Sequence, residues 1–213
     1  MPGPELTRRD VDGRPNGLIL MLHGGKADSL TPVDGKNASW RRSNAMMSHI
    51  SGRANRVGAS IWLLRHQQAG WNERDASPPS PVPDARWALA EARRELSDLP
   101  VVLLGHSMGG RTAVAVADEP HVTGVVALAP WLPADESAQT LAGKQFAAAH
   151  GRSDKITSCR ETQAFVRRAE SVASSTEFKD MGRVGHFMIR RISTWNDFAI
   201  TRSLAILSEH ANP

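Results

Sequence analysis

Residues 101–110 read VVLLGHSMGG, and residues 108–118 continue as a helical pattern rich in small side chains. The apolar run predicts a buried strand that passes through a Gly-x-Ser-x-Gly motif into a helix. Such a turn needs glycine two positions either side of the serine, because a side chain there would meet the neighbouring backbone. Ser107 is then held in a strained conformation above the sheet, facing the first amides of the helix. The stretch predicts a nucleophile elbow with Ser107 as the nucleophile.

Outward from this stretch, short apolar runs alternate with helical patterns along the whole chain. That alternation is typical of a parallel sheet covered on both faces, with its ligand site beyond the carboxyl ends of the strands. We expect strands at 18–22, 59–64, 101–104, 122–129, 145–149 and 176–179, and helices from a cap at Asn37 or Ser39 to Val57 and at 84–96, 108–118, 160–173 and 193–209. We therefore predict one α/β domain over residues 1–213, with about six strands in a mostly parallel sheet and an irregular segment at 1–16.

A serine hydroxyl needs a base to take its proton, and the base needs a carboxylate to fix its tautomer. His186 follows the last expected strand in a Gly-His-Phe sequence, so it can reach a serine above the sheet. Asp154 follows the strand that ends at residue 149, and Asp135 follows the preceding strand as the alternative acid. The chain order Ser, Asp, His favours Asp154. We expect His106 to point away from the serine and to be packed or hydrogen-bonded.

The tetrahedral intermediate of acyl transfer needs two backbone N–H donors. Met108, directly after the serine, supplies one. The second is expected in residues 22–26, Leu-His-Gly-Gly-Lys, which follow the first apolar run. We assign it to Gly25, with Lys26 as the alternative.

Taken together, these motifs resemble those of the α/β-hydrolase superfamily. The resemblance extends from about residue 17 to 209 and rests on the His-Gly loop at 23–24, the elbow, the His-Gly-x-x-Asp motif at 150–154 and the late Gly-His at 185–186. It implies a three-layer α/β-hydrolase fold and a serine hydrolase of the small carboxylesterase, thioesterase or dienelactone-hydrolase kind. The usual leading pair of strands is not recognisable, which is why six strands are expected. Only residues 131–144 separate two consecutive strands, which implies that there is no cap domain.

The substrate pocket is expected among the loops at the same edge of the sheet. Trp71, Trp131 and Phe187 are candidate substrate-binding residues because they fall in those loops. Arg111 lies in the first turn of the elbow helix, where a cation is mildly disfavoured. With Lys26, Arg65 and Arg152, which also follow strands, it suggests a preference for anionic esters.

Composition excludes several other classes of protein. The 26 Lys and Arg residues exceed the 22 Asp and Glu, but they are scattered as isolated pairs without interleaved aromatic residues, which argues against nucleic-acid binding. The single cysteine excludes an internal disulfide and a multi-cysteine zinc site. No apolar run is long enough to span a membrane, and the first residues lack the apolar core of a signal peptide, so we expect a cytoplasmic protein.

From the motifs we expect a small-molecule ester or thioester as substrate, with no metal and no organic cofactor. Two other functions are compatible with the same residues. A cofactor-free perhydrolase or an acyltransferase would keep the whole triad, whereas a non-catalytic ligand-binding module usually loses one of its members.

Overall fold

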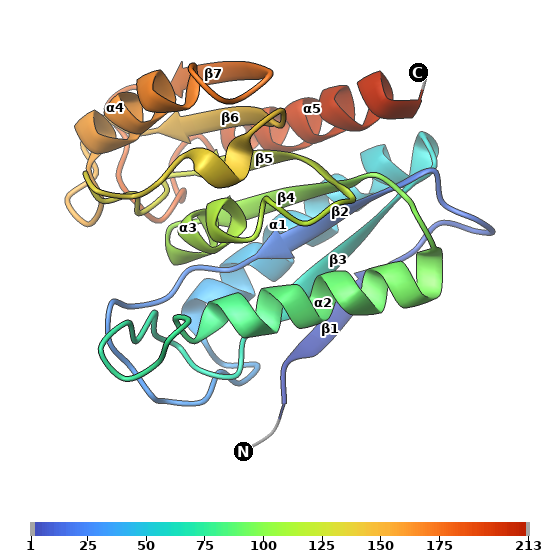
Figure 1. The fold of residues 1–213 in the computed structure, drawn as a ribbon, viewed down its shortest axis with the longest axis horizontal. Coiled ribbons are helices and arrows are strands. Elements are labelled where there is room, and N and C mark those ends of the chain that lie inside the picture. Colours follow the sequence, from blue (N-terminus) through green and yellow to red (C-terminus); the bar gives the residue numbers. More distant parts are fainter. Residues whose placement is uncertain (1–2, 212–213) are drawn as a thin grey trace.

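A seven-stranded sheet runs through the middle of the protein (Figure 1). The computed structural model describes residues 3–211. The strands are β1 (Glu5–Arg9), β2 (Gly17–Leu22), β3 (Ala59–Arg65), β4 (Val101–His106), β5 (Val122–Leu128), β6 (Gln145–His150) and β7 (Ser175–Asp180). They lie in the order β1-β3-β2-β4-β5-β6-β7, and every neighbouring pair is parallel except β1 with β3.

Helices cover both faces of this sheet, as predicted. Helices α1 (Ala38–Arg56) and α5 (Ile192–Ala211) pack on one face, and α2 (Pro81–Leu96), α3 (Met108–Ala115) and α4 (Cys159–Ala169) pack on the other (Figure 1). Strand β2 explains why the central strands are apolar throughout. Its alternate residues Leu18, Leu20 and Leu22 belong to the core under α2–α4, whereas Ile19 and Met21 belong to the core under α1 and α5. Burial on both faces removes the alternation of polar and apolar residues.

The strand at residues 5–9 corrects the prediction of an irregular N-terminal segment and of a six-stranded sheet. Strand β1 pairs antiparallel with β3 at the edge of the sheet. It is only partly buried, and its sequence, Glu-Leu-Thr-Arg-Arg, has one large apolar residue. Leu6 packs against the core, and two charged side chains also contact the sheet: Arg8 lies over the ring of Trp62 at 4.1 Å, and Glu5 pairs with Arg65. An edge strand held by backbone hydrogen bonds and charged side chains has no hydrophobic pattern to detect.

The helix boundaries agree with the predictions to within a few residues. Asn37 caps α1, and its side chain accepts a hydrogen bond from the amide of Trp40 at 3.1 Å. Helix α2 begins at Pro81 rather than at residue 84, because proline is tolerated in the first turn, where no intrahelical N–H bond is lost. Helix α3 ends at residue 115 rather than 118, and α4 at residue 169 rather than 173.

No cap covers the carboxyl edge of the sheet. The connection from β5 to β6 contains only a short 3₁₀ turn, Gln139–Leu141, within residues 129–144. This agrees with the lidless architecture that the resemblance implies. Across residues 3–211, no helix combines the length and the apolar character that a bilayer crossing requires.

Candidate active site

Ser107 lies in the turn between β4 and α3, as the elbow motif predicts. Its backbone has φ 56° and ψ −120°, a conformation that costs a non-glycine residue energy. A methyl group at Gly105 would overlap the carbonyl of Gly109, and one at Gly109 would overlap the carbonyl of Leu22. Both positions therefore require glycine, because neighbouring backbone approaches them too closely for a side chain.

The three residues of the predicted triad meet above the carboxyl ends of the strands. The Nε2 atom of His186 lies 2.9 Å from the Ser107 hydroxyl, and Nδ1 lies 2.7 Å from Oδ2 of Asp154. His186 comes from the loop after β7 and Asp154 from the loop after β6. Both side chains are buried, and Asp135 makes no hydrogen bond with the imidazole. The structure thus joins the favoured acid, and not the alternative, to His186.

Hydrogen bonds saturate the Asp154 carboxylate. Its Oδ1 accepts from the amides of Ile156 and Thr157 at 2.8 and 3.0 Å. Its Oδ2 lies 3.1 Å from both the Thr157 hydroxyl and Nε2 of His150, in addition to His186. Burial by itself would raise the pKa of Asp154, but the bonds from the two imidazoles and the two amides outweigh it and hold the pKa far below its ordinary value. This carboxylate is ionised whenever the protein is folded near neutral pH.

The two candidate oxyanion donors lie beside Ser107. Among the described residues, neither the amide of Gly25 nor that of Met108 donates to a protein acceptor. The amide of Lys26 is committed, because it donates to the carbonyl of Ala69 at 2.8 Å. A Cβ atom at Gly25 would lie 2.5 Å from that same carbonyl and from the sulfur of Met108, so only glycine fits. The free amide is thus that of Gly25 rather than Lys26.

Two adjoining hollows open next to the nucleophile. The first, which we call the Ser107 hollow, has a volume of about 410 Å³ and is lined by Gly25, Lys26, Ala27, Ser107, Trp131, Ile156 and Thr157. A second hollow of about 640 Å³ shares Trp131, Ile156 and Thr157 with it and continues along the start of α4. The sequence analysis did not single out Ile156 or Thr157. No local pattern marks them, because they acquire their place from the loop that carries Asp154.

The three aromatic residues expected to bind substrate occupy different positions. Trp131 lines both hollows. Trp71 is buried behind it, with the two rings edge to face at 6.2 Å. Phe187 is 61% exposed and lies edge to face against His186 at 5.4 Å. Only Trp131 therefore lines the Ser107 hollow directly.

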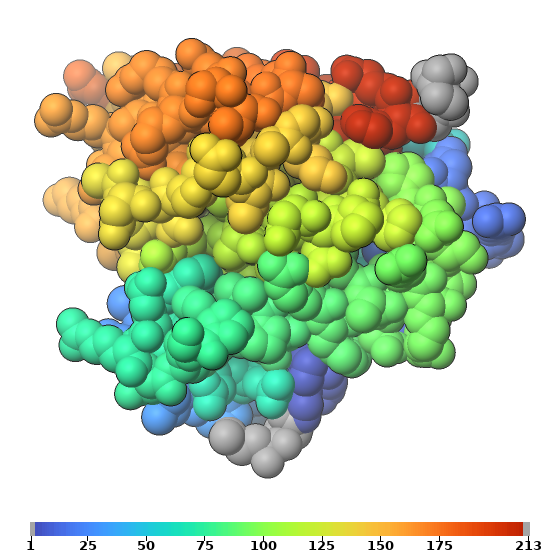
Figure 2. Space-filling model, in the orientation of Figure 1, coloured from blue at the N-terminus to red at the C-terminus, as the bar shows by residue number. Residues whose placement is uncertain are grey.

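Arg111 is inserted between the two tryptophans. Its guanidinium carbon lies 4.2 Å from the ring centre of Trp71 and 4.7 Å from that of Trp131. It pairs with the largely buried Glu136 and lies 3.7 Å from Glu73. In the space-filling view, the segment around residue 75 and the β5–β6 connection lie side by side where these acids converge (Figure 2). The charge of Arg111 is thus compensated within the protein.

The other cations that suggested an anionic substrate are also mostly paired. Arg65 pairs with Glu5, and Arg152 with Asp180 at 3.2 Å. Lys26 lines the Ser107 hollow and has no ion-pair partner among residues 3–211. Of the four positive charges, only the exposed Lys26 is therefore left without an acidic partner among residues 3–211.

Two histidines near Ser107 form hydrogen bonds with backbone groups and not with the residues of the triad. His106 is buried, and its Nε2 donates to the carbonyl of His186 at 3.1 Å, as its expected packed role requires. In the loop after β2, the ring of His23 donates to the carbonyl of Gly24 at 2.7 Å and accepts from the amide of His66 at 3.2 Å. Burial, with a smaller effect from a neighbouring imidazole, lowers the pKa of His106 and of His23 to about 3. Both rings are neutral and fix the loops on either side of the nucleophile.

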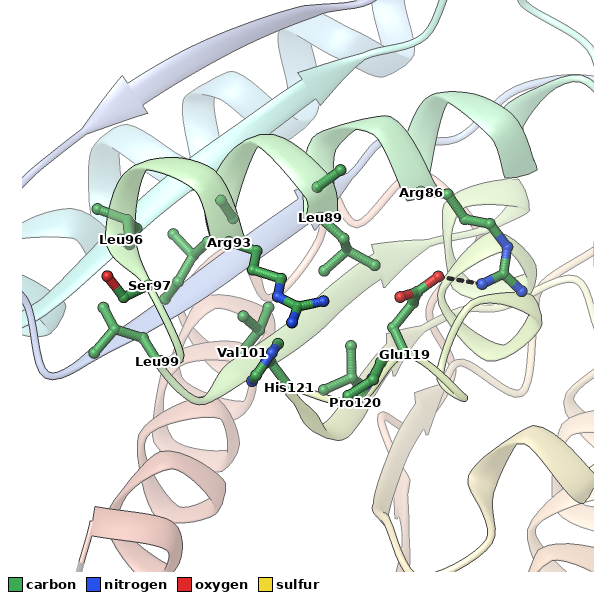
Figure 3. A pocket seen from close by; sticks show the side chains of 14 residues that line it. Arg86, Leu89, Arg93, Leu96, Ser97, Leu99, Val101, Glu119, Pro120 and His121 are labelled. Atoms are coloured by element: carbon green, nitrogen blue, oxygen red, sulfur yellow. Dashed lines mark hydrogen bonds and ion pairs between the residues drawn. The ribbon is translucent and has the colours of Figure 1, made fainter.

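A separate pocket of about 150 Å³ lies at the opposite end of the strands (Figure 3). It is enclosed by the end of α2 and the beginnings of β4 and β5, and most of its lining is apolar. Its one serine, Ser97, makes no hydrogen bond with His121, the histidine in the same pocket. The pocket lies apart from Ser107, Asp154 and His186, none of which is among its lining residues.

Comparisons with known proteins agree with the fold. Three solved structures share the fold over nearly the whole chain. An α/β serine hydrolase homologue from Coxiella burnetii has 17% identity and a TM-score of 0.72, covering 95% of this chain and 94% of its own. Est1E from Butyrivibrio proteoclasticus, with ferulic acid bound, has 13% identity and a TM-score of 0.68, covering 96% of both chains. An α/β serine hydrolase without a lid from Xanthomonas campestris has 12% identity and a TM-score of 0.69, covering 95% and 88%.

The sequence itself shows the family. A comparison with curated proteins found no match. The model of the alpha/beta hydrolase family matches residues 19–205, which include the elbow, the Asp154 loop and the His186 loop. Because the match spans most of the sequence, this chain belongs to the alpha/beta hydrolase family.

Proposed function

We propose that the protein is a serine hydrolase that cleaves a carboxylic ester or thioester of a small to medium-sized substrate through an acyl-enzyme on Ser107. The observation that carries this proposal is the hydrogen-bonded chain from Asp154 through His186 to Ser107, at 2.7 and 2.9 Å. Its members lie on three separate loops and meet at a hydroxyl beside an open hollow. Distances in this range allow direct proton transfer.

In the acylation step, Nε2 of His186 takes the proton of Ser107 as Oγ attacks the acyl carbonyl. Asp154 accepts from Nδ1–H, so it selects the tautomer whose Nε2 is free to act as base and stabilises the imidazolium that forms. His186 then returns the proton to the leaving oxygen or sulfur. The acyl group stays on Ser107.

The developing oxyanion is held by the amides of Met108 and Gly25. Both lie beside Ser107, and neither donates to an acceptor within residues 3–211. The Met108 amide also begins α3, so the positive end of the helix adds to the stabilisation. Water then attacks the acyl-enzyme with His186 again as base, and the acid is released.

The hollows suggest which substrates fit. The Ser107 hollow is walled by Trp131, which Arg111 and Trp71 hold from behind, and Phe187 flanks His186. We assign Trp131 to direct contact with substrate, Phe187 to the margin of the site and Trp71 to support. Absence of a lid favours soluble esters over long-chain lipids. Est1E, a structural relative, has ferulic acid bound, which supports a carboxylic acid product of modest size.

A fluorophosphonate probe tests the proposal, because it reacts with an activated serine. We expect labelling of the peptide that contains Ser107, no labelling of Ser107→Ala, and hydrolysis of short p-nitrophenyl esters by the wild type only. A folded protein that is neither labelled nor active would refute the proposal and favour a ligand-binding module.

The same acyl-enzyme can pass its acyl group to an acceptor other than water. Products are therefore analysed with and without hydrogen peroxide or an alcohol. A peracid or a new ester formed faster than the free acid would place the protein with the perhydrolases or the acyltransferases.

A further inference from the structure

A second buried histidine contacts the carboxylate of the triad. His150, the last residue of β6, is fully buried. Its Nε2 lies 3.1 Å from Oδ2 of Asp154, the same oxygen that accepts from His186. Its Nδ1 lies 2.8 Å from the hydroxyl of Thr162 in α4, which is fully buried too. The catalytic cycle proposed above does not use this imidazole.

The surroundings of Thr162 fix the protonation of the ring. Among the described residues, His150 is the only hydrogen-bond partner of that hydroxyl. A buried hydroxyl that did not donate would leave a hydrogen unsatisfied, which is costly. The Thr162 hydroxyl therefore donates to Nδ1. The proton of a neutral His150 then lies on Nε2, which donates to Asp154.

We propose that His150 is a positioning residue for the reaction: its Nε2–H, oriented by Thr162, fixes Oδ2 of Asp154 in the position from which it orients His186. The inference rests on the proposed function. The amides of Ile156 and Thr157 anchor only Oδ1. The Thr157 hydroxyl also lies 3.1 Å from Oδ2, but it lies within hydrogen-bond distance of the Ala129 carbonyl as well. His150 is the last residue of β6, so it anchors Oδ2 from outside the loop that carries Asp154 and Thr157.

The bond also has an electrostatic consequence. A neutral donor on Oδ2 withdraws part of the negative charge that stabilises the protonated form of His186. Removal of the donor should favour protonated His186 and move the acid limb of the activity profile to higher pH. The neighbouring elements also carry His106 against His186, Arg42 of α1, which donates to the carbonyls of Phe187 and Met188, Cys159 at the start of α4, and the exposed pair of Arg152 and Asp180. Lys155, Arg160 and Glu161 line the second hollow beside Asp154. The variants below change none of them.

Three variants separate positioning from simple packing. His150→Leu removes the donor, His150→Gln restores an N–H near Nε2, and Thr162→Val removes the orienting hydroxyl at nearly equal volume. His121→Gln, at the opposite end of the strands, serves as the histidine control. For each we measure kcat and KM with a short p-nitrophenyl ester, the pH profile, fluorophosphonate labelling and the melting temperature.

We expect His150→Leu to lower kcat about 10- to 100-fold, by analogy with residues that orient metal ligands, whose loss typically has an effect of this size. KM should change less than about twofold, because ester binding is unaffected, and the acid limb should move to higher pH. His150→Gln should recover most of kcat, and Thr162→Val should change kcat in the same direction as His150→Leu but less. His121→Gln should behave as the wild type.

Two results would overturn the inference while leaving the function intact. One is a folded His150→Leu with wild-type kcat and acid limb. The other is an equal loss in the Leu and Gln variants with an unmoved acid limb, which would indicate packing alone. If His150→Leu does not fold, Thr162→Val decides: an unchanged kcat and profile there refutes the inference. A wild type that is neither labelled nor active refutes the proposed function instead, and the inference with it.

Discussion

Replacing Asp154 with asparagine tests the central hydrogen-bond chain with almost no change of shape. The exchange turns one acceptor oxygen into a donating NH₂ group. Each carboxylate oxygen faces donors: Oδ1 the amides of Ile156 and Thr157, and Oδ2 the rings of His186 and His150. In either orientation, the new NH₂ group therefore faces two hydrogen-bond donors where the carboxylate had an acceptor oxygen.

The orientation that keeps the two backbone bonds sets the effect on catalysis. It directs the amide at Nδ1 of His186, which must then accept, so the ring proton moves to Nε2 and points at Ser107. A ring in this tautomer cannot take the serine proton. The same exchange in a serine protease triad lowers kcat about 10⁴-fold. We expect a fall of about 10³- to 10⁴-fold, equivalent to about 4 to 5.5 kcal/mol of activation free energy.

The assay is kcat for a short p-nitrophenyl ester, with Asp135→Asn as the matched control. Asp135 follows the neighbouring strand and is exposed, so its variant should stay within about twofold of the wild type. Circular dichroism confirms that both variants are folded. The reasoning is refuted if folded Asp154→Asn keeps more than a tenth of the activity, or if the control is the variant that loses it.

Three further predictions concern the elbow, the pH dependence of stability and the charge of the substrate. Gly109→Ala should lower stability by about 1–3 kcal/mol or more, because its methyl group would overlap the Leu22 carbonyl; an unchanged melting temperature contradicts this. The lowered pKa of Asp154 stabilises the fold above the ordinary carboxyl pKa of about 4, and this contribution is lost as pH falls toward the folded-state pKa. The free energy of unfolding of the wild type should exceed that of Asp154→Asn by less and less below about pH 4, as measured from urea midpoints. A difference that stays constant with pH would mean that the lowered pKa of Asp154 does not contribute to stability. Neutral and carboxylate esters of equal size should differ less than about fivefold in kcat/KM, since Lys26 is exposed; a difference above 30-fold would mean that a buried charge is engaged.

The elbow could be predicted because its causes are local. A tight strand-to-helix turn restricts the residues at 105, 107 and 109 regardless of the rest of the fold, and the structure has Ser107 at positive φ as expected. The acid and base were predicted by chain order and by their positions after strands. Parallel strands bring such positions to one edge, so the sequence could join residues that are 32 to 79 positions apart.

The edge strand and the ion pairing of the basic residues could not be predicted, because both depend on partners that are distant in the sequence. Strand β1 has one large apolar side chain and is held by backbone pairing, so it lacks the period that marks a strand. From its position in the sequence, Arg111 could bind an anionic substrate or pair with an acidic residue of the protein. Only the fold brings Glu136 to its guanidinium and encloses it between two tryptophans.

Histidine shows this limit most clearly, because the ring takes its chemistry from its neighbours. Of the five buried histidines among residues 3–211, four belong to the triad, contact it or lie next to an oxyanion-hole loop residue or the nucleophile in the sequence: His23, His106, His150 and His186. Their hydrogen-bond partners differ, and of the four only His186 has a hydroxyl on one nitrogen and a carboxylate on the other at the mouth of a hollow. His150 has the same two kinds of partner, but its hydroxyl is that of a buried threonine behind the site. The base and the positioning residue therefore differ in which hydroxyl contacts the nitrogen that does not contact Asp154. The fold determines that partner, so a motif of five residues cannot predict it.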